Sequence, residues 1–261
     1  MDVNLDIVNA MKPITLDEMS GVKLMNRIDT KYLVTEDQLH EILLGIKDSY
    51  YAQEVEGNRL SPYSTVYYDT PDLMMYMIHH DRHLVRYKVR VRTYVDSHLT
   101  FCEVKHKNNK GRTKKKRIVV EPIPNIVDNP EAAAFLAEKQ PYDVQSLTPN
   151  VITIFDRFTL VNYDKTERLT IDRNLHFENK RTGESASMAP LVVIELKQDG
   201  RASSLFKEVL FNLRIHPFKM SKYCIGTCLT TPNLKRNRFK KKLRRIEKLK
   251  ATMKTSSNKA S

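Results

Sequence analysis

The sequence contains no tryptophan, only seven glycines and only three cysteines in 261 residues. So few glycines leave no place for a glycine-rich nucleotide loop, and neither GxGxxG nor GxxxxGK[ST] occurs. The cysteines (Cys102, Cys224 and Cys228) are odd in number and lack CxxC spacing, which argues against a disulfide framework or a structural zinc site. Cysteine usage therefore indicates a reducing compartment.

Long apolar runs are also missing. No stretch approaches the roughly 20 apolar residues that a membrane-spanning helix needs, and the first residues lack the basic and apolar regions of a signal peptide. We therefore expect a cytoplasmic protein. The apolar fraction of 41% and the charged fraction of 29% are compatible with a folded chain.

The net charge of +13 is concentrated at the C-terminal end of the chain. Residues 234–261 hold 12 Lys and Arg against one acidic residue, whereas residues 1–233 hold 32 basic and 30 acidic residues. The sequence thus predicts a nearly neutral domain over residues 1–232 and a basic tail over residues 233–261. The tail is predicted to form an amphipathic helix, because apolar residues recur in it at helical spacing: Phe239, Leu243, Ile246 and Leu249.

Residues 84–107 carry the clearest charge pattern. Four cations alternate with apolar or aromatic residues along one segment: Arg86, Lys88, Arg90 and Arg92. A β-strand sends alternate side chains to opposite faces, so one face of this strand is cationic. Residues 101–107 continue the alternation with Glu103, Lys105 and Lys107 on one face. A row of like charges must face either water or a polyanion.

Similar alternation predicts eight strands in total, at about residues 27–34, 62–69, 84–94, 101–107, 113–121, 151–161, 167–177 and 191–197. Helices are predicted at about residues 35–46, 70–80, 130–139 and 204–213, with a helical lead-in over residues 1–26. Charge recurs on one face of at least six strands, and an eight-stranded antiparallel sheet can close. We therefore predict an α+β fold with an eight-stranded antiparallel closed β-barrel, flanking helices and a cationic lumen that also contains Glu103, Asp172 and Glu195.

Seven segments, in this order, resemble the VTC (vacuolar transporter chaperone) polyphosphate polymerase domain of the triphosphate tunnel metalloenzyme, or CYTH-like, superfamily. They are Arg27-Ile-Asp-Thr-Lys31-Tyr, Tyr67-Tyr-Asp-Thr-Pro-Asp72, Lys88-Val-Arg90-Val-Arg92-Thr-Tyr, Phe101-Cys-Glu103-Val-Lys105, Arg168-Leu-Thr-Ile-Asp172, Glu195-Leu-Lys197 and Lys219-Met-Ser-Lys222-Tyr. The resemblance covers roughly residues 20–230.

This resemblance implies a tunnel that binds the triphosphate of ATP together with Mn²⁺ or Mg²⁺. The γ-phosphoryl group would pass to a growing inorganic polyphosphate chain, with release of ADP. By motif position the phosphate-contacting residues would be Lys31, Arg90, Arg92, Lys105, Arg157, Arg168, Lys219, Ser221 and Lys222. Further phosphate-binding candidates are Lys115, Arg117 and Lys197, and the metal-binding candidates are Glu195 and Glu103.

Two departures from the wider family affect the interpretation. Many members of the superfamily begin with an ExExK strand, whereas this chain has Arg27-Ile-Asp-Thr-Lys31, which fits the polymerase branch better than the triphosphatase branch. The eukaryotic polymerases also carry a phosphate-sensing domain and membrane helices that this sequence lacks. We therefore do not expect this chain to translocate polyphosphate itself, which leaves room for a membrane-protein partner.

Several of these residues also have simpler interpretations. A cationic strand can be a solvated outer strand, and Glu195 or Glu103 can serve in an ion pair rather than as a metal ligand. The segment Lys219-Met-Ser-Lys222 matches a signature of class I tRNA synthetases, but the HxGH motif of that family is absent. His79, His80 and His83 have no cysteine nearby, which favours a packing role over a metal site.

Three functions remain open from the sequence. The first is the ATP-dependent polyphosphate polymerase, and the second is a tripolyphosphatase or nucleoside triphosphatase of the same fold. The third is a non-catalytic protein that binds polyphosphate or nucleic acid, although nucleic acid is not expected as a specific ligand. The basic tail is expected to hold product polyphosphate, to bind nucleic acid or anionic lipid at a membrane surface, or to pack at the tunnel mouth.

Overall fold

The computed structural model describes residues 2–20, 27–122, 124–200 and 203–257. The helices are α1 (Val3–Ala10), α2 (Leu16–Ser20), α3 (Glu36–Ile46), α4 (Met74–His80), α5 (Pro130–Lys139), α6 (Leu205–Asn212), α7 (Lys222–Thr230) and α8 (Lys240–Ser257). Short 3₁₀ turns are η1 (Lys47–Ser49), η2 (Ile126–Asp128), η3 (Val144–Ser146) and η4 (Asn237–Phe239). The predicted helical lead-in contains α1 and α2 with a short strand between them, and its residues 21–26 lie outside the described part.

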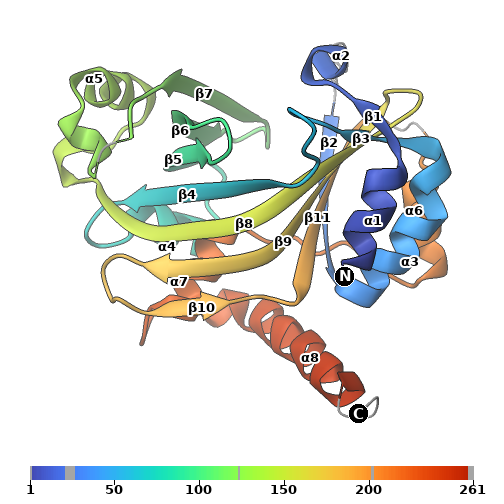
Figure 1. Cartoon of the computed structure of the whole chain (residues 1–261). Helices are drawn as coiled ribbons and strands as arrows, with labels where there is room; N and C mark the ends of the chain where they lie inside the picture. Colours follow the sequence, from blue (N-terminus) through green and yellow to red (C-terminus); the bar gives the residue numbers. More distant parts are fainter. Residues whose placement is uncertain (1, 21–26, 123, 201–202, 258–261) are drawn as a thin grey trace.

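All eight predicted strands occur and pair side by side in one large antiparallel sheet (Figure 1). They are β2 (Arg27–Thr35), β4 (Ser61–Asp69), β5 (Arg86–Tyr94), β6 (Leu99–Lys107), β7 (Thr113–Val119), β8 (Thr148–Asn162), β9 (Glu167–Asn179) and β11 (Leu191–Asp199). Their order across the sheet is β2-β11-β9-β8-β4-β5-β6-β7. Three short strands were not predicted: β1 (Lys12–Ile14), β3 (Tyr50–Gln53) and β10 (Ser185–Ser187).

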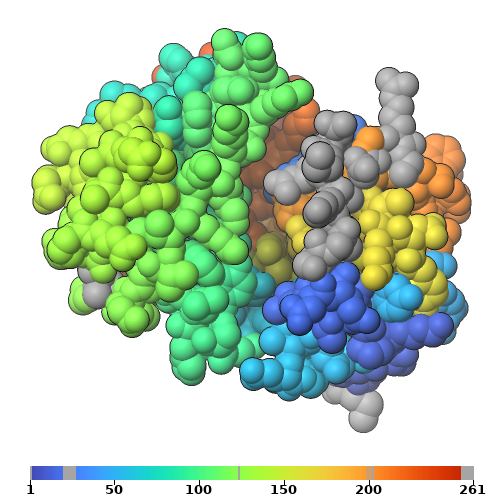
Figure 2. Space-filling model, turned by 90° about the horizontal axis from the view of Figure 1, so that it is seen from above, coloured from blue at the N-terminus to red at the C-terminus, as the bar shows by residue number. Residues whose placement is uncertain are grey.

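The predicted closure of the barrel is not confirmed, because the pairing ends at β7 and β2 within the described residues. Residues 114–117 of β7 are all exposed Lys or Arg, and such charges on an edge strand resist further pairing. At the other edge, the backbone N–H of Phe218 donates to the carbonyl of Lys31 at 2.6 Å, so a loop occupies part of β2. The sheet is therefore open, and Figure 2 shows a hollow between the green residues and the blue-to-orange residues opposite.

The starts of two helices show how side chains define these boundaries. Thr35 and Gln38 form the predicted capping box at the start of α3, with reciprocal side-chain hydrogen bonds to backbone N–H groups. Helix α4 starts at Met74, four residues later than predicted. The hydroxyl of Thr70 accepts the N–H of Met74, and the carboxylate of Asp69 accepts those of Met75 and Tyr76, so the predicted first turn serves as a cap.

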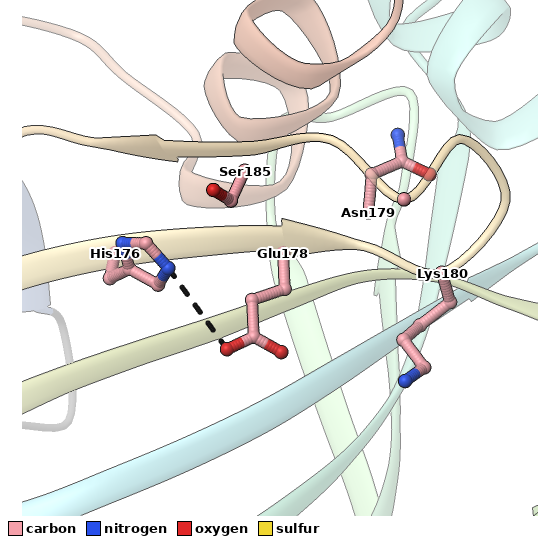
Figure 3. Close-up of a pocket in the computed structure, with 6 residues that line it drawn as sticks. His176, Glu178, Asn179, Lys180 and Ser185 are labelled. Carbon is pink, nitrogen blue, oxygen red and sulfur yellow. Dashed lines mark ion pairs between the residues drawn. The ribbon is translucent and has the colours of Figure 1, made fainter.

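The hairpin of β9 and β10 carries a shallow depression of about 360 Å³, lined by His176, Glu178, Asn179, Lys180, Gly183 and Ser185 (Figure 3). His176 and Glu178 form a long ion pair of 4.0 Å. Both residues alternate with Phe177, which packs into the interior opposite Thr153. The depression therefore lies on the face of the sheet opposite to Phe177.

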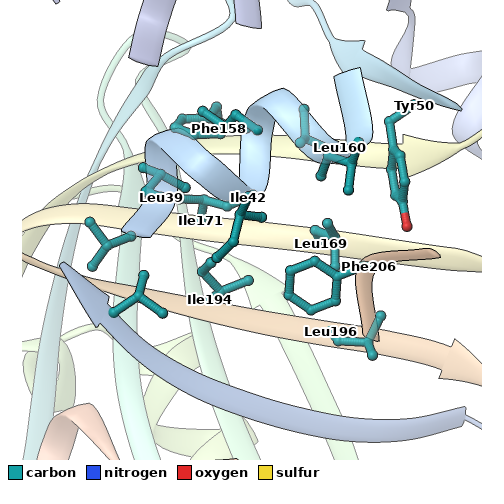
Figure 4. Packing of buried hydrophobic residues seen from close by; sticks show 14 of the residues in the cluster. Leu39, Ile42, Tyr50, Phe158, Leu160, Leu169, Ile171, Ile194, Leu196 and Phe206 are labelled. Carbon is teal, nitrogen blue, oxygen red and sulfur yellow. The ribbon is translucent and has the colours of Figure 1, made fainter. Parts of the chain in front are cut away.

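Two hydrophobic clusters cover the outer face of the sheet. The first joins α1, α3 and α6 to β8, β9 and β11 and includes Leu39, Ile42, Phe158, Ile171 and Ile194 (Figure 4). The second packs α5 and η2 on β4, β5 and β6, and its members include Tyr68, Val89, Cys102, Val104 and Leu136. Burial of these apolar faces leaves the charged face of each strand on the inner, concave side of the sheet.

A third cluster packs α7 and α8 against the concave side of β4, β8 and β9. It contains Tyr67, Val151 and Phe177 from the sheet and Tyr223 and Cys224 from α7. The predicted helix of the tail is present as α8, and its apolar residues join the same cluster: Phe239, Leu243, Ile246 and Leu249. None of the helices in the described ranges is long and apolar enough to cross a membrane.

The packing of α7 depends on a close approach at Gly226. An added Cβ at Gly226 would lie 2.5 Å from Cδ1 of Phe177 and 3.0 Å from Cγ1 of Val151. We expect Gly226→Ala to lower the free energy of unfolding by about 1–3 kcal/mol, because overpacking forces α7 away from the sheet. Urea unfolding followed by circular dichroism measures the change.

The matched control is Gly45→Ala on α3, where the nearest atom, at 2.9 Å, is a methyl carbon of the partly buried Val209. Both variants gain about 1 kcal/mol from the helix propensity of Ala, but Val209 is only partly buried and can shift, so the effect of Gly45→Ala should be smaller. Equal stability of Gly226→Ala and the wild type would contradict the close packing of α7.

Candidate functional site

The strand register brings the predicted site residues onto one face of the sheet. Residues directly opposite each other in an antiparallel pair point to the same side. The opposed pairs include Lys31 with Glu195, Lys197 with Arg168, Arg157 with Asp172, Arg90 with Glu103, and Lys105 with Lys115. The concave face therefore collects charged side chains from seven strands.

Glu103 is the first of three carboxylates that each bind two cations. Its side chain is fully buried on β6. It accepts hydrogen bonds from Arg90 Nε at 2.6 Å and from Lys115 Nζ at 2.9 Å. Burial alone would raise the pKa of Glu103, but the charges of Arg90 and Lys115 lower this pKa to about 2.

Asp172 on β9 is the second such carboxylate. Arg157 binds both of its oxygens, with Nε at 2.5 Å and Nη2 at 2.8 Å, and Lys222 donates to it as well. Burial opposes ionisation, but these two cations lower the pKa of Asp172 to about 2. The ammonium of Lys222 also lies 3.0 Å from the ring centroid of Phe155. Burial lowers the pKa of Lys222 to about 7, despite its bond to Asp172.

Glu195 on β11 is the third carboxylate. It forms an ion pair with Lys31 of the neighbouring strand β2 and another with Lys197, whose Nζ lies 3.3 Å away. Burial would raise the pKa of Glu195, but the charges of Lys197 and Lys31 hold it well below its usual range. The side chain of Lys31 is 32% exposed, so this cation can turn toward a ligand.

Arg92 and Lys105 lie between these groups, and neither forms an ion pair within the described part of the chain. Arg92 is 9% exposed, and its Nε donates to the hydroxyl of Thr65 at 3.1 Å. Burial, together with the charges of Arg90 and Arg157, lowers the pKa of Arg92 to about 10. The charge of Arg90, followed by burial, holds the pKa of Lys105 well below its usual value. The concave face therefore holds positive charge in excess of its carboxylates.

The start of α7 is held inside the concave face by polar contacts. Ser221 caps the helix by accepting the N–H of Cys224, and its hydroxyl also accepts a hydrogen bond from Lys88 Nζ at 2.8 Å. The hydroxyl of Tyr223 donates to the buried carboxylate of Asp69, and its ring packs 5.2 Å from that of Tyr67. The positive end of the helix dipole is thus added to the side-chain cations.

Two predicted site residues lie at the margin of this arrangement. Arg117 on β7 is exposed, and its guanidinium stacks 4.1 Å from the ring centroid of Phe101. Lys219 is also exposed, two residues before the cap of α7. His80 has a packing role, as expected, because it is buried and its ring contacts Asp81 and Asn237 at 2.7 Å each.

The sequence interpretation missed the aromatic and hydroxyl groups of the site. Thr65 and Tyr67 on β4 contact Arg92 and Arg90, and alternation along residues 61–69 could have placed them on the same face. Phe155, beneath Lys222, lies two residues before Arg157 on the same face of β8, so alternation along residues 151–157 could have placed it as well.

The carboxylates differ in how well they fit a divalent cation. Among the described residues, no group of three or more His, Cys, Asp or Glu side chains is arranged to hold a metal ion. Both oxygens of Glu103 are bonded to cations in a fully buried position, so Glu103 does not fit. Glu195 fits as a single ligand, because cations bound to phosphates need only one or two carboxylates besides phosphate oxygens and water.

Solved structures with a similar fold come from several organisms. HpAC1 from Hippeastrum, described as a putative adenylyl cyclase with a dominant triphosphatase activity, is 12% identical, with a TM-score of 0.52 over 80% of this chain and 99% of its own. A putative adenylate cyclase from Vibrio parahaemolyticus is 12% identical, with a TM-score of 0.44 over 77% of this chain and 97% of its own. The PH1819 protein from Pyrococcus horikoshii is also 12% identical, with a TM-score of 0.42 over 77% of this chain and 98% of its own.

At 12% identity, the similarity to HpAC1 concerns the fold alone. A search of curated proteins finds no match. The family model described as "VTC domain" matches residues 26–231. This range includes all eight long strands of the sheet, from β2 to β11, and the start of α7. The chain therefore belongs to the VTC domain family.

Proposed function

We propose that this protein is an ATP-dependent polyphosphate polymerase. The triphosphate of ATP would bind on the concave face, and its γ-phosphoryl group would pass to the terminal phosphate of a growing chain, with release of ADP. The observation that carries this proposal is the state of the three buried carboxylates, each of which is bonded to two cations.

The excess cations explain how a triphosphate would be held. Arg92 and Lys105 lack a carboxylate of their own among the described residues, so phosphate oxygens would neutralise them at little cost. Arg90, Arg157 and Lys222 surround them, and arginine forks bind pairs of phosphate oxygens. The transferred phosphoryl group carries its charge on equatorial oxygens in a loose transition state. Positioning and charge stabilisation by these residues would therefore supply most of the catalysis.

The buried carboxylates are poorly suited to activate water. The pKa values of Glu103 and Asp172 are about 2, and that of Glu195 lies well below its usual range. Groups with such low pKa values are weak general bases near neutral pH. A phosphate-chain acceptor is already anionic and needs no base, and the surrounding cations would attract it. The site chemistry thus favours a phosphate acceptor over water.

The residues also indicate where a divalent cation would act. When bound, Mn²⁺ or Mg²⁺ neutralises negative charge on the phosphate oxygens. Glu195 is the side chain that would hold it, after Lys31 turns from Glu195 to a phosphate. Lys197 and Arg168 lie opposite each other on the same face and would bind the adjacent phosphates.

A triphosphatase is the second candidate. HpAC1, which shares the fold, is described as having a dominant triphosphatase activity. In this chain Asp29 is an exposed carboxylate opposite Lys197 on the concave face, and it would be the base for an attacking water. A non-catalytic polyphosphate-binding protein would have the same cations but no turnover.

Turnover with ATP separates these functions. Purified protein incubated with ATP and Mn²⁺ should release ADP and form long phosphate chains on a polyphosphate gel, with little orthophosphate. Orthophosphate without chains would support the triphosphatase instead. Binding of ATP without either product would eliminate both enzymatic functions.

Arg92 offers a variant that separates binding from stability. We expect Arg92→Gln to weaken ATP binding by about 10-fold or more, because a hydrogen bond to a charged group contributes about 1.5–3 kcal/mol. The melting temperature of the free protein should stay the same or rise, because the change removes a buried cation that has no carboxylate partner among the described residues. Calorimetric titration and thermal unfolding measure the two effects.

The control for Arg92 is Arg173→Gln. Arg173 is equally buried but binds Asp2 and Glu36, on the other side of β9 from Asp172. This variant should lower the melting temperature and keep ATP affinity within about twofold. The reverse pattern, with ATP binding lost only in Arg173→Gln, would refute the assignment of the concave face as the ATP-binding site.

The low pKa of Lys222 predicts a pH dependence. Lys222, with a pKa of about 7, is protonated below that pH, and bound phosphate favours the protonated form. ATP affinity should therefore fall as pH rises above 7, by at most about tenfold per pH unit from this group. Lys222→Arg, which stays charged, should show a shallower decline in titrations between about pH 6 and pH 9. Since the titration of ATP affects both proteins equally, identical slopes would exclude this role for Lys222.

A further inference from the structure

A second group of cations lies where the concave face meets α4, α7 and α8. We call it the outer cation cluster, and its members are Arg82, Arg86, Lys107, Lys219 and Lys242. Arg86 and Lys107 are directly opposite each other on β5 and β6. Lys88, two residues beyond Arg86 on the same face, donates to Ser221, which places the segment with Lys219 beside these strands.

The start of α8 completes the cluster. The ring of Phe239 packs 6.1 Å from that of His79 on α4, and Lys242 Nζ lies 5.5 Å from the Phe239 centroid. Arg82 follows the end of α4. The cluster thus unites α4, β5, β6, the segment before α7, and α8.

Burial and the positive charges of the cluster lower the pKa values of two of its lysines and of the neighbouring His79. Burial lowers the pKa of Lys107, and the charges of Arg86 and Lys219 lower it further. Lys242 is affected in the same way by burial and by Arg82, Lys219 and Arg86. Burial and the nearby charges of Lys88, Arg86, Lys242 and Lys107 lower the pKa of His79 to about 2.

The outer cation cluster differs from the centre of the concave face in its lack of carboxylates. Within the described ranges, none of its five members forms an ion pair. Asp81, which directly follows α4, is bonded to His80 and Lys235. Four cations of the nearly neutral domain and one of the basic tail, none with a carboxylate partner among the described residues, indicate a binding surface for a polyanion.

We propose that the outer cation cluster binds the polyphosphate product as it leaves the concave face and directs it toward the exposed basic side of α8. This inference rests on the proposed polymerase function. Lys88 is the link between the two regions, because it lies between Arg86 and Arg90 on the same strand face and contacts Ser221. A chain several phosphates long would then contact the central cations and the cluster together.

Linear polyphosphate fits this surface better than a membrane or a nucleic acid does. Leu84 and Val85 are exposed nearby, but the apolar residues of α8 are buried, so little apolar surface remains for lipid. Phe239 is only 5% exposed and is not available for base stacking. The cations follow a strand face and a helix, as a linear chain of phosphates requires.

The test compares a short and a long ligand. The double variant Lys107→Gln/Lys242→Gln should bind polyphosphate several tens of phosphates long about tenfold more weakly than the wild type at moderate salt. For the long polyphosphate, the plot of log affinity against log salt concentration should become less steep, with the magnitude of its slope reduced by about one to two. Tripolyphosphate would occupy only the centre of the concave face, so the affinity of the double variant for it should change by less than about threefold. Calorimetric titrations measure all of these values.

The matched control, Lys47→Gln/Lys180→Gln, removes two exposed cations outside the cluster and should leave both affinities within about twofold of wild type. Equal losses for the short and long ligands, or an equal loss in the control, would overturn the inference. Loss of binding to phosphatidylserine vesicles or single-stranded RNA, with polyphosphate binding retained, would overturn it in favour of that partner. Failure of the wild type to make polyphosphate would refute the polymerase and leave these binding results interpretable.

Discussion

The balance between cations and carboxylates on the concave face governs the rest of this structure. A buried cation is costly unless a neighbouring charge compensates it. Glu103, Asp172 and Glu195 each compensate two cations, which holds six basic side chains on the concave side of the sheet. Arg92 and Lys105 exceed this supply; burial, followed by neighbouring charges, lowers the pKa of Arg92, and the charge of Arg90, followed by burial, lowers that of Lys105. The free protein therefore carries excess positive charge on its concave face, and a bound polyanion would neutralise it.

The architecture around this face keeps it accessible. Apolar clusters cover the outer side of the sheet, so the polar sides of the strands must face inward. The sheet remains open between β7 and β2, and the contact between Phe218 and Lys31 links one edge to the segment that leads into α7. Helix α7 packs tightly on β8 and β9 through Gly226, which fixes Ser221 and Lys222 beside the central cations. The same contacts that stabilise the third cluster thus position the site.

This arrangement has a consequence for the chemistry. A site whose three buried carboxylates are all paired lacks a strong base among them but can orient and neutralise several phosphates at once. Transfer between two phosphate groups suits it, because both donor and acceptor are anionic. The outer cation cluster extends the same charge along β5 and β6 to α8, so a product longer than three phosphates would meet cations beyond the centre. Binding and exit of the chain would then depend on one continuous electrostatic surface.

The residue pattern by itself determined much of this protein. Alternation predicted all eight long strands and the charged face of at least six of them, because side-chain direction in a strand depends only on local backbone geometry. Helical spacing predicted α3 and α8, and helices were also predicted where α5 and α6 lie. Closure of the barrel was not confirmed, because pairing between β7 and β2 depends on long-range geometry and on the charge of an edge strand.

Tertiary structure alone decided which charges compensate each other. Lys31 and Glu195 are 164 residues apart in the chain, and Lys222 and Asp172 are 50 apart, so no local pattern could pair them. Tertiary packing placed Lys222 of α7 over Phe155 and buried the apolar side of α8. The sequence could identify the cations, but only the fold showed that Arg92 and Lys105 have no carboxylate partner among the described residues. Compensation depends on distances of a few ångströms between distant segments, which only the folded chain defines.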